Sequence, residues 1–128
     1  MSKVDTNGVI SFLQAVHQYT PDAFPLDGNR RLIAPFWADV DTRRGGMNTY
    51  RELLRGTPEN EDIFQRADAI IHDAFLGYED NFLATWMFIA TWDKVAFFGS
   101  NAPTIVSTRA RLIHTACPIK VFLSQLGL

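Results

Sequence analysis

The sequence has a single cysteine, Cys117, so it cannot form a disulfide within the chain. It contains no N-x-Ser/Thr glycosylation sequon and no apolar run close to the ~18 residues that a membrane-spanning helix needs. The first five residues are polar, and no apolar stretch follows them as it would in a secretory signal peptide. Taken alone, these absences favour an intracellular protein, and they predict that this segment does not insert into a membrane.

Acidic residues are missing from the last part of the chain. Residues 94–128 contain four Lys or Arg and no Asp or Glu, whereas residues 1–93 carry all fourteen acids. The net charge of the whole chain is -2, which gives no case for nucleic-acid binding. A change of sign this sharp within one small domain indicates either a functional basic edge or a segment of different origin.

Motifs of the common enzyme classes are absent as well. The sequence has no Gly-rich phosphate loop, no nucleophile elbow and no zinc-protease signature. Its three histidines have no partner at zinc-ligand spacing, and Cys117 has no evident base partner. We therefore expect a protein that is not an enzyme and that uses no cofactor.

The clearest predicted element is a helix over about residues 59–75. Its apolar residues recur at helical spacing and form one stripe. Thr57 can cap its amino end with Pro58 in the first turn, and acidic residues lie where the helix dipole favours them. The apolar stripe needs a surface to cover it, and a sheet is the obvious one.

Several other segments have the patterns of β-strands. Residues 9–12 follow an Asn-Gly turn, residues 32–40 alternate in polarity, and residues 47–53 follow a Gly-Gly turn. Residues 83–92 are apolar on both faces, which predicts a central strand, with residues 95–98 as its hairpin partner. We therefore predict an α+β fold, a mostly antiparallel β-sheet with the long amphipathic helix packed on it.

Four stretches occur in an order that resembles a known family. They are Asn7–Phe12 (NGVISF), residues 32–43 (LIAPFWADVDTR), Tyr50–Glu52, and residues 89–95 (IATWDKV), with the predicted helix before the last. Together they resemble the NIDO domain, the extracellular module of nidogen, alpha-tectorin, mucin-4 and related matrix or cell-surface proteins, and the alpha-tectorin-like branch in particular. The resemblance spans about residues 4–99.

This resemblance implies a function and a location. It implies a non-catalytic module that acts in cell-matrix adhesion or matrix assembly as part of a larger protein. It also implies an extracellular location, with matrix proteins or glycans as partners.

Residues 101–128 depart from the family pattern. After the Gly-Ser turn the family continues with further strands around an Asp-Gly hairpin, which this segment does not show. We therefore predict a partial NIDO-like domain over residues 1–100 and a divergent C-terminal segment over residues 101–128 that is not part of the family fold. Strands missing in this way would leave an exposed sheet edge.

Asp39 and Asp41 are candidate ligands for a metal ion. On a strand they would share a face and could bind a divalent cation through their oxygens, and Asp93 could join them in a catalytic site. The same two residues precede a turn, where Asp commonly accepts hydrogen bonds from nearby backbone N–H groups. We favour the structural role, because the remaining oxygen ligands of a cation site are missing from the pattern.

Basic and aromatic residues near this turn are candidates for binding a partner. Arg43 and Arg44, together with Arg51 and Arg55, could bind an anionic glycan or an acidic protein. They could equally balance the acidic helix, which we favour. The three tryptophans would pack between sheet and helix, and Trp37 is the best candidate for exposure and for partner contacts.

Three functions therefore compete at the level of the sequence. We favour an extracellular binding module within a larger matrix or surface protein. An intracellular binding or scaffold domain is the second hypothesis, supported by the lone cysteine and the missing sequons. The third is a metal-dependent hydrolase that uses Asp39, Asp41 and Asp93.

Overall fold

The computed structural model describes residues 2–75, 82–99, 105–114 and 119–125. The chain divides into two compact units. Unit 1 comprises Met1–Tyr50, Ala90–Ala110 and Leu123–Leu128, and unit 2 comprises Arg51–Ile89 and Arg111–Phe122. Strands β4 (Met47–Leu54), β5 (Trp86–Ala96) and β6 (Ile105–His114) contribute residues to both units.

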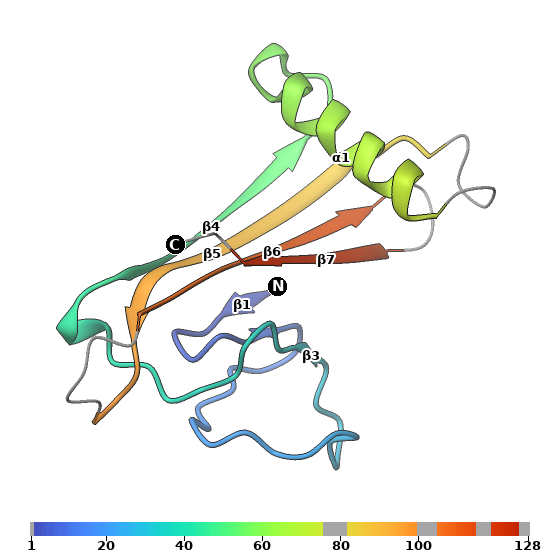
Figure 1. Cartoon of the computed structure of the whole chain (residues 1–128). Helices are drawn as coiled ribbons and strands as arrows, with labels where there is room; N and C mark the ends of the chain where they lie inside the picture. Colours follow the sequence, from blue (N-terminus) through green and yellow to red (C-terminus); the bar gives the residue numbers. More distant parts are fainter. Residues whose placement is uncertain (1, 76–81, 100–104, 115–118, 126–128) are drawn as a thin grey trace. The chain divides into compact units, whose positions relative to one another are not determined.

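The described elements comprise seven strands, one α-helix and two short 3-10 helices, η1 and η2. They are β1 (Lys3–Val4), β2 (Ile10–Ser11), β3 (Leu32–Ile33), η1 (Thr42–Arg44), β4 (Met47–Leu54), η2 (Pro58–Asn60), α1 (Glu61–Ala74), β5 (Trp86–Ala96), β6 (Ile105–His114) and β7 (Ile119–Gln125). Strands β1 to β3 form a small antiparallel sheet, and the longer strands form a second sheet in the order β4-β5-β6-β7. The strand direction reverses from β4 to β5 and again from β5 to β6 (Figure 1). The predicted α+β fold with a mostly antiparallel sheet is confirmed.

The Asn7-Gly8 turn organises unit 1. The side-chain Oδ1 of Asn7 accepts a hydrogen bond of 2.9 Å from the Val40 N–H, and its backbone carbonyl accepts one of 3.0 Å from Ala38. Gly8 has a φ of 84°, and a Cβ at this position would lie 2.7 Å from the ring of Phe36. Only glycine tolerates both conditions, so the predicted turn into β2 is confirmed with a physical reason.

The predicted strand over residues 32–40 is much shorter than expected. Only Leu32 and Ile33 pair as β3, while Val40 forms an isolated bridge with Phe97. Pro35 lies between these two points and has no N–H to donate, which interrupts a ladder of hydrogen bonds.

Strand β5 is longer than expected. It runs through Asp93 and Lys94 to Ala96, so the prediction that residues 95–98 form a separate hairpin partner is wrong. Lys94 adopts a φ of 52° within the strand, and its N–H donates a hydrogen bond of 3.0 Å to Ser107 Oγ. A local irregularity of the strand therefore replaces the expected turn. The interior position of β5 in the sheet confirms the predicted central strand.

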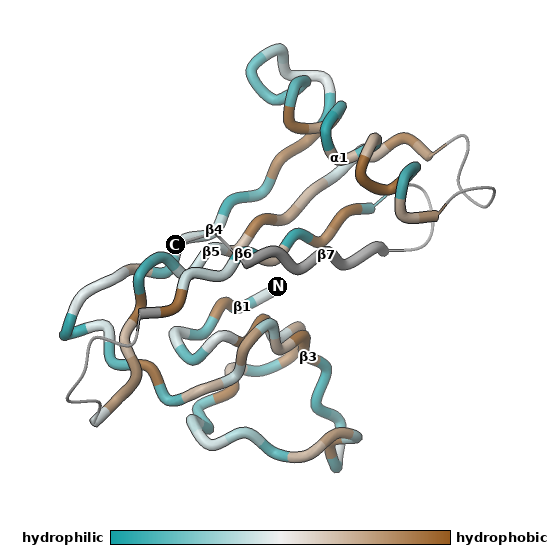
Figure 2. Tube along the Cα trace, viewed as in Figure 1, coloured by the Kyte–Doolittle hydropathy of each residue, from teal (hydrophilic) through white to brown (hydrophobic). Residues whose placement is uncertain are grey.

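Helix α1 packs across the ends of β4, β5 and β6 that belong to unit 2 (Figure 1). Hydrophobic and hydrophilic residues alternate along its turns (Figure 2), as an amphipathic helix requires. One buried cluster joins the helix to the strands, and its members are Leu53, Phe64, Ala67, Ile71, Ala84, Met87, Ile89 and Ile113. The predicted helix is confirmed, with η2 as its first turn. Thr57 is the N-cap residue of η2 and Pro58 follows in its first turn, as predicted, but the Thr57 side chain makes no capping hydrogen bond and its hydroxyl donates to the Leu54 carbonyl.

The tryptophans do not pack beneath the helix as predicted. Trp92 is fully buried in unit 1, where its ring meets Phe36 edge to face at 5.4 Å and its Nε1–H donates to the Asp5 carbonyl at 2.9 Å. Trp86 is half-buried, and its Nε1–H donates to Glu52. Successive side chains of a strand point to opposite faces. The helix covers the odd-numbered residues of β5, so the tryptophans at even positions take the other face.

Arg55 joins three segments of unit 2. Its guanidinium donates to Asp68 at 2.7 Å, to Glu61 at 2.8 Å and to the carbonyl of Ala84 at 3.0 Å. It also lies over the ring of Phe64, 5.5 Å from the centroid. The pairing with Asp68, and secondarily with Glu61, raises the pKa of Arg55 above its ordinary value. For Arg55, the predicted balancing of the acidic helix is confirmed.

We expect Arg55→Ala to lower the free energy of unfolding by about 2–4 kcal/mol, because it leaves the half-buried carboxylate of Asp68 without its cation. Urea unfolding followed by tryptophan fluorescence measures the change. Arg66→Ala is the matched control, since Arg66 pairs with Asp62 where both side chains are more than half exposed. Its loss should cost less than about 0.5 kcal/mol. Equal losses for the two variants would show that Arg55 stabilises the fold no more than an exposed ion pair does.

Strands β6 and β7 lie in the segment predicted to be outside the family fold. β6 has a neighbour on each side in the sheet, and its residues Ala110, Leu112 and Ile113 are buried. The four-stranded sheet therefore continues past residue 104, and β5 is not the exposed edge that a chain ending there would leave. The boundary of the family domain near residue 100 stays a prediction.

Truncating a buried side chain of β6 tests that boundary. We expect Ile113→Ala to lower the free energy of unfolding by about 2–4 kcal/mol, because it opens a cavity in the cluster under α1. Leu54→Ala, at a residue that is 62% exposed, is the control and should change stability little. A loss for Ile113→Ala no larger than that of the control would place residues 105–114 outside the stable fold.

Candidate functional site

The predicted site residues Asp41, Arg43 and Arg44 lie together in the turn before β4. The Asp41 carboxylate accepts a hydrogen bond of 3.1 Å from the Arg43 N–H, which caps η1. It also accepts two from the guanidinium of Arg43, at 2.7 and 3.0 Å. The side chain of Asp41 is 10% exposed, whereas that of Arg43 is 77% exposed. The hydrogen bonds from the Arg43 side chain lower the pKa of Asp41, so this acid performs the structural role that the turn predicted.

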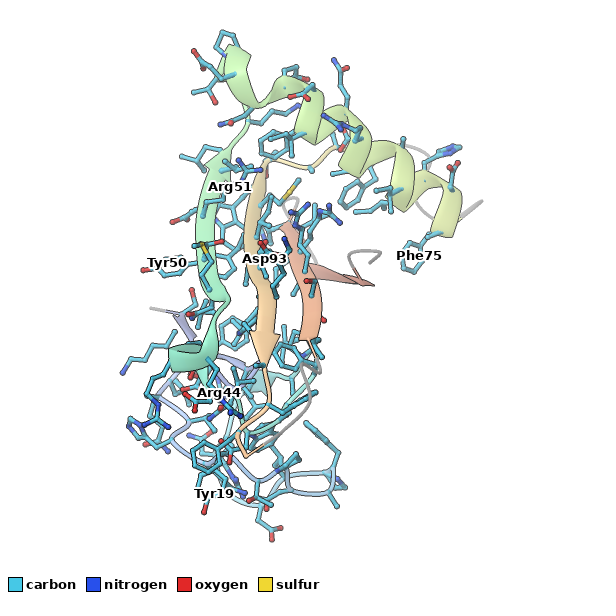
Figure 3. The ribbon with its side chains drawn as sticks, turned by 60° about the vertical axis from the view of Figure 1, so that its left-hand side comes forward. Tyr19, Arg44, Tyr50, Arg51, Phe75 and Asp93 are labelled. Atoms are coloured by element: carbon cyan, nitrogen blue, oxygen red, sulfur yellow. The ribbon has the colours of Figure 1, made fainter. Side chains whose placement is uncertain are left out.

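The three candidate acids Asp39, Asp41 and Asp93 do not form one cluster. The Asp39 carbonyl accepts a backbone hydrogen bond of 2.9 Å from Phe98, and the Asp93 carboxylate accepts one of 3.4 Å from the Ser107 hydroxyl. Asp93 lies on β5 (Figure 3). Among the residues that the structure describes, no three His, Cys, Asp or Glu side chains are close enough to hold a metal ion. The cation site at Asp39 and Asp41 stays a prediction, and both oxygens of Asp41 already accept hydrogen bonds from Arg43.

Trp37 does not have the exposure that was predicted for it. It is 8% exposed, and its Nε1–H donates a hydrogen bond of 3.0 Å to the carbonyl of Gln18. The expectation that it is the most exposed tryptophan is therefore wrong, because Trp86 is only half-buried. The loop at Gln18 supplies the acceptor that makes burial of the indole favourable. Partner contacts by Trp37, Arg43 and Arg44 stay predictions.

Arg43 has a second neighbour that keeps its guanidinium in place. The ring of Phe98, which is itself 58% exposed, lies 5.9 Å from the guanidinium carbon. Stacking of this kind leaves the edges of a guanidinium open to hydrogen bonds. Because Nε and Nη2 of Arg43 already donate to Asp41, a further anion would bind at the Nη1 side of the guanidinium. The turn therefore presents a positioned cation at the surface of unit 1.

A pocket of about 150 Å³ lies in unit 1 between the loop after β2 and the start of β3. Gln18 and Arg30 are part of its lining. Arg30 donates to Asp22 at 2.8 Å, and the hydrogen bonds from Gln18 and then Arg30 lower the pKa of Asp22. This volume is below the roughly 300–1,000 Å³ of most small-molecule sites, so the pocket suits a single side chain or sugar-sized group. The sequence carries no signal for it, because its lining comes from two segments, residues 11–18 and 29–32, that are separated in the chain.

Strand β4 presents the most exposed apolar side chains of the large sheet. Met47, Tyr50 and Leu54 are 61%, 66% and 62% exposed. Tyr50 points away from β5 (Figure 3). β4 is also an outer strand in the order of that sheet. The turn that contains Arg43 and Arg44 is called the basic turn below. The surface of β4, the pocket and the basic turn are the three candidate binding surfaces of the described residues.

Comparison with known proteins places these features in a family. The model of the nidogen-like (NIDO) domain matches residues 1–109 of this chain. The chain belongs to the NIDO family. The match includes the Asn7-Gly8 turn, the 32–43 segment and β5, which carried the resemblance in the sequence.

Several relatives share this NIDO domain over most of the present chain. Alpha-tectorin of Mus musculus is 43% identical over 105 residues, and that of Gallus gallus is 39% identical over 112 residues. These alignments cover 82% and 88% of this chain but only 5% of each alpha-tectorin. Nidogen of Drosophila melanogaster is 28% identical over 110 residues, which are 86% of this chain and 8% of that protein.

No solved structure matches this NIDO chain. Within the described residues, no helix has both the length and the apolar character required to cross a lipid bilayer.

The stabilising role of Asp41 should depend on pH in a defined direction. Because the pKa of Asp41 is lowered in the folded chain, its charged form stabilises the fold at pH values above 3.8. This contribution is lost as the pH falls through the lowered pKa. We expect Asp41→Asn to lower the thermal midpoint at neutral pH, and this difference from the wild type to shrink as the pH falls below 3.8 and through the lowered pKa.

Asp27→Asn, at an exposed loop position, is the control for Asp41→Asn and should change the midpoint little at neutral pH. Thermal unfolding with added Ca²⁺, Mg²⁺ or Mn²⁺ tests the competing role. A midpoint that rises with one of these ions in the wild type but not in Asp41→Asn would contradict the ion-pair role and support the cation site.

Proposed function

We propose that this chain is a non-catalytic module of a larger extracellular matrix or cell-surface protein, and that it binds matrix proteins or glycans. The observation that carries the proposal is its 39–43% identity to alpha-tectorins over most of its length. Nidogen, a matrix protein of the same family, is similar over a comparable span. Because the chain spans about a twentieth of the alpha-tectorins, the proposal concerns the NIDO module and not the functions of those whole proteins.

The basic turn is the surface that we assign to an acidic partner. Arg43 is oriented by Asp41 and Phe98, so little side-chain entropy is lost when it binds an anion. Arg44 follows it in η1 and adds a second positive charge. Sulfate and carboxylate groups of glycans match the planar guanidinium through paired hydrogen bonds. Trp37 would contribute by holding the loop at Gln18 rather than by direct contact.

The two alternatives have weaker support. An intracellular scaffold domain agrees with the lone cysteine, but the chain is 43% identical to the alpha-tectorin of Mus musculus. A metal-dependent hydrolase needs Asp39, Asp41 and Asp93 in one cluster, and the described residues contain no such cluster.

Retention on a matrix tests the proposal. We expect the purified, fluorescently labelled chain to be retained on decellularised fibroblast matrix well above serum albumin. Arg43→Gln combined with Arg44→Gln should weaken retention roughly tenfold, because two cationic contacts are lost. Arg66→Gln, at an exposed arginine of α1, is the matched control and should have no effect.

Enzymatic treatment of the matrix identifies the class of partner. Loss of retention after digestion of glycosaminoglycans indicates glycan binding, and loss after mild proteolysis indicates a protein partner. Retention no higher than that of albumin would contradict the proposed function. An equal loss for Arg66→Gln would show that charge in general, rather than the turn, mediates binding.

A further inference from the structure

We propose that the pocket beside β3 binds one hexuronic acid unit of a glycan, that is, a sugar ring that carries a carboxylate. The described residues that line this pocket belong to segments 11–18 and 29–32, and both segments lie in unit 1. The proposal rests on the proposed function for the class of ligand, a glycan, but it adds a site that is separate from the basic turn. Its test uses the purified chain and small soluble ligands, without a matrix.

Hydrogen bonds of Gln18 and Arg30 fix one wall of the pocket. The Gln18 carbonyl accepts a hydrogen bond of 3.0 Å from the Trp37 Nε1–H, and its side-chain amide donates one of 2.6 Å to the Thr20 carbonyl. Arg30 donates to Gln18 Oε1 at 3.4 Å and to the Asp22 carboxylate at 2.8 Å. These two side chains therefore shape the pocket rather than bind its ligand, and a wall formed in advance lowers the entropy lost on binding.

Arg31 supplies the positive charge that the pocket offers to a ligand. Asp22 balances the charge of Arg30, whereas the exposed side chain of Arg31 has no ion pair or hydrogen bond within the described part of the chain. The Arg31 carbonyl accepts a hydrogen bond of 3.0 Å from the Phe12 N–H, which fixes the backbone from which this side chain extends. None of the described lining residues is Asp or Glu. The pocket therefore favours an anion, and a carboxylate matches the planar guanidinium.

The rest of the lining has the mixed character that a sugar ring requires. Three exposed lining residues have side chains that form hydrogen bonds, and they are Gln14, His17 and Asn29. Leu13 and Leu32 add apolar side chains. The hydroxyl groups of a pyranose ring form hydrogen bonds, and its C–H face packs against apolar groups. An acidic peptide side chain has a carboxylate but no hydroxyl groups, so the lining favours an acidic sugar over an acidic peptide.

The size of the pocket limits the ligand to one sugar unit. Its volume is about 150 Å³, whereas most small-molecule sites have roughly 300–1,000 Å³. The other units of a longer glycan would extend into solvent and add little affinity. At the low end of ligand efficiency, one methyl glycoside should bind with a dissociation constant of roughly 1 mM.

Titration of the isotope-labelled full chain with methyl β-D-glucuronide, followed by NMR, tests this site. We expect saturable changes of backbone amide shifts at residues 11–18 and 29–32. Methyl β-D-glucoside has a hydroxymethyl group in place of the carboxylate, so it should bind at least about tenfold more weakly. N-acetylglutamate amide presents a carboxylate without a sugar ring, and it should also bind at least about tenfold more weakly, because it leaves the amide and apolar lining unused.

Substitution of Arg31 separates the carboxylate contact from the other contacts of the ring. Arg31→Gln removes the cation but keeps the backbone carbonyl that bonds to Phe12, and the thermal midpoint checks that this variant folds. It should raise the dissociation constant of the glucuronide at least about tenfold and leave that of the glucoside unchanged. Arg31→Lys keeps the charge without the paired hydrogen bonds and should give an intermediate value. Arg66→Gln, at an exposed arginine of α1, is the matched control and should bind as the wild type does.

Several results would overturn the proposal. Equal binding of the glucuronide and the glucoside would exclude recognition of the carboxylate, and stronger binding of N-acetylglutamate amide would assign the pocket to an acidic peptide. Shift changes confined to Arg43 and Arg44 would place the ligand at the basic turn, which excludes the pocket but agrees with the proposed function. Binding of the glucuronide by a chain that is not retained on matrix would count against the proposed function alone.

Discussion

The guanidinium of Arg55 is the interaction on which unit 2 depends. It binds the first turn of α1 through Glu61, the middle of the helix through Asp68, and the chain before β5 through Ala84. Asp68 also accepts a hydrogen bond of 2.8 Å from the Ala84 N–H. The Arg55–Asp68 ion pair therefore holds both α1 and the chain just before β5. Apolar packing alone would allow an amphipathic helix several orientations on a sheet. The directed hydrogen bonds of Arg55 select the one orientation in which Phe64 and its neighbours pack together.

Unit 1 depends on a different constraint, the two-residue periodicity of β5. Residues of this strand alternate between faces, and the buried Trp92 is directed toward the N-terminal segment, where Asp5 accepts its N–H. Asn7 bonds to Ala38 and Val40 in the same unit, so the turn and the 32–43 segment are held by side-chain and backbone hydrogen bonds instead of a long ladder. This arrangement explains why residues 7–12 and 32–43, two of the stretches that carry the family resemblance, are largely irregular in structure.

The surfaces left by these constraints have different chemical characters. The basic turn offers a positioned cation, which suits an acidic partner. Strand β4 presents exposed apolar side chains, among them Met47 and Leu54. The two surfaces share no residue, so contacts made by one need not compete with contacts made by the other.

The sequence by itself determined the α+β class, the helix and the family, because helical spacing between residues 59 and 75 and the order of the turn motifs are local properties of the chain. It also determined the capping role of Asp41, whose partner is two residues away. Only the tertiary structure decided the burial of Trp37, the pocket beside β3 and the outer position of β4. These features depend on which distant segments of the chain meet. The residue pattern within one strand does not reveal which other strand it pairs with.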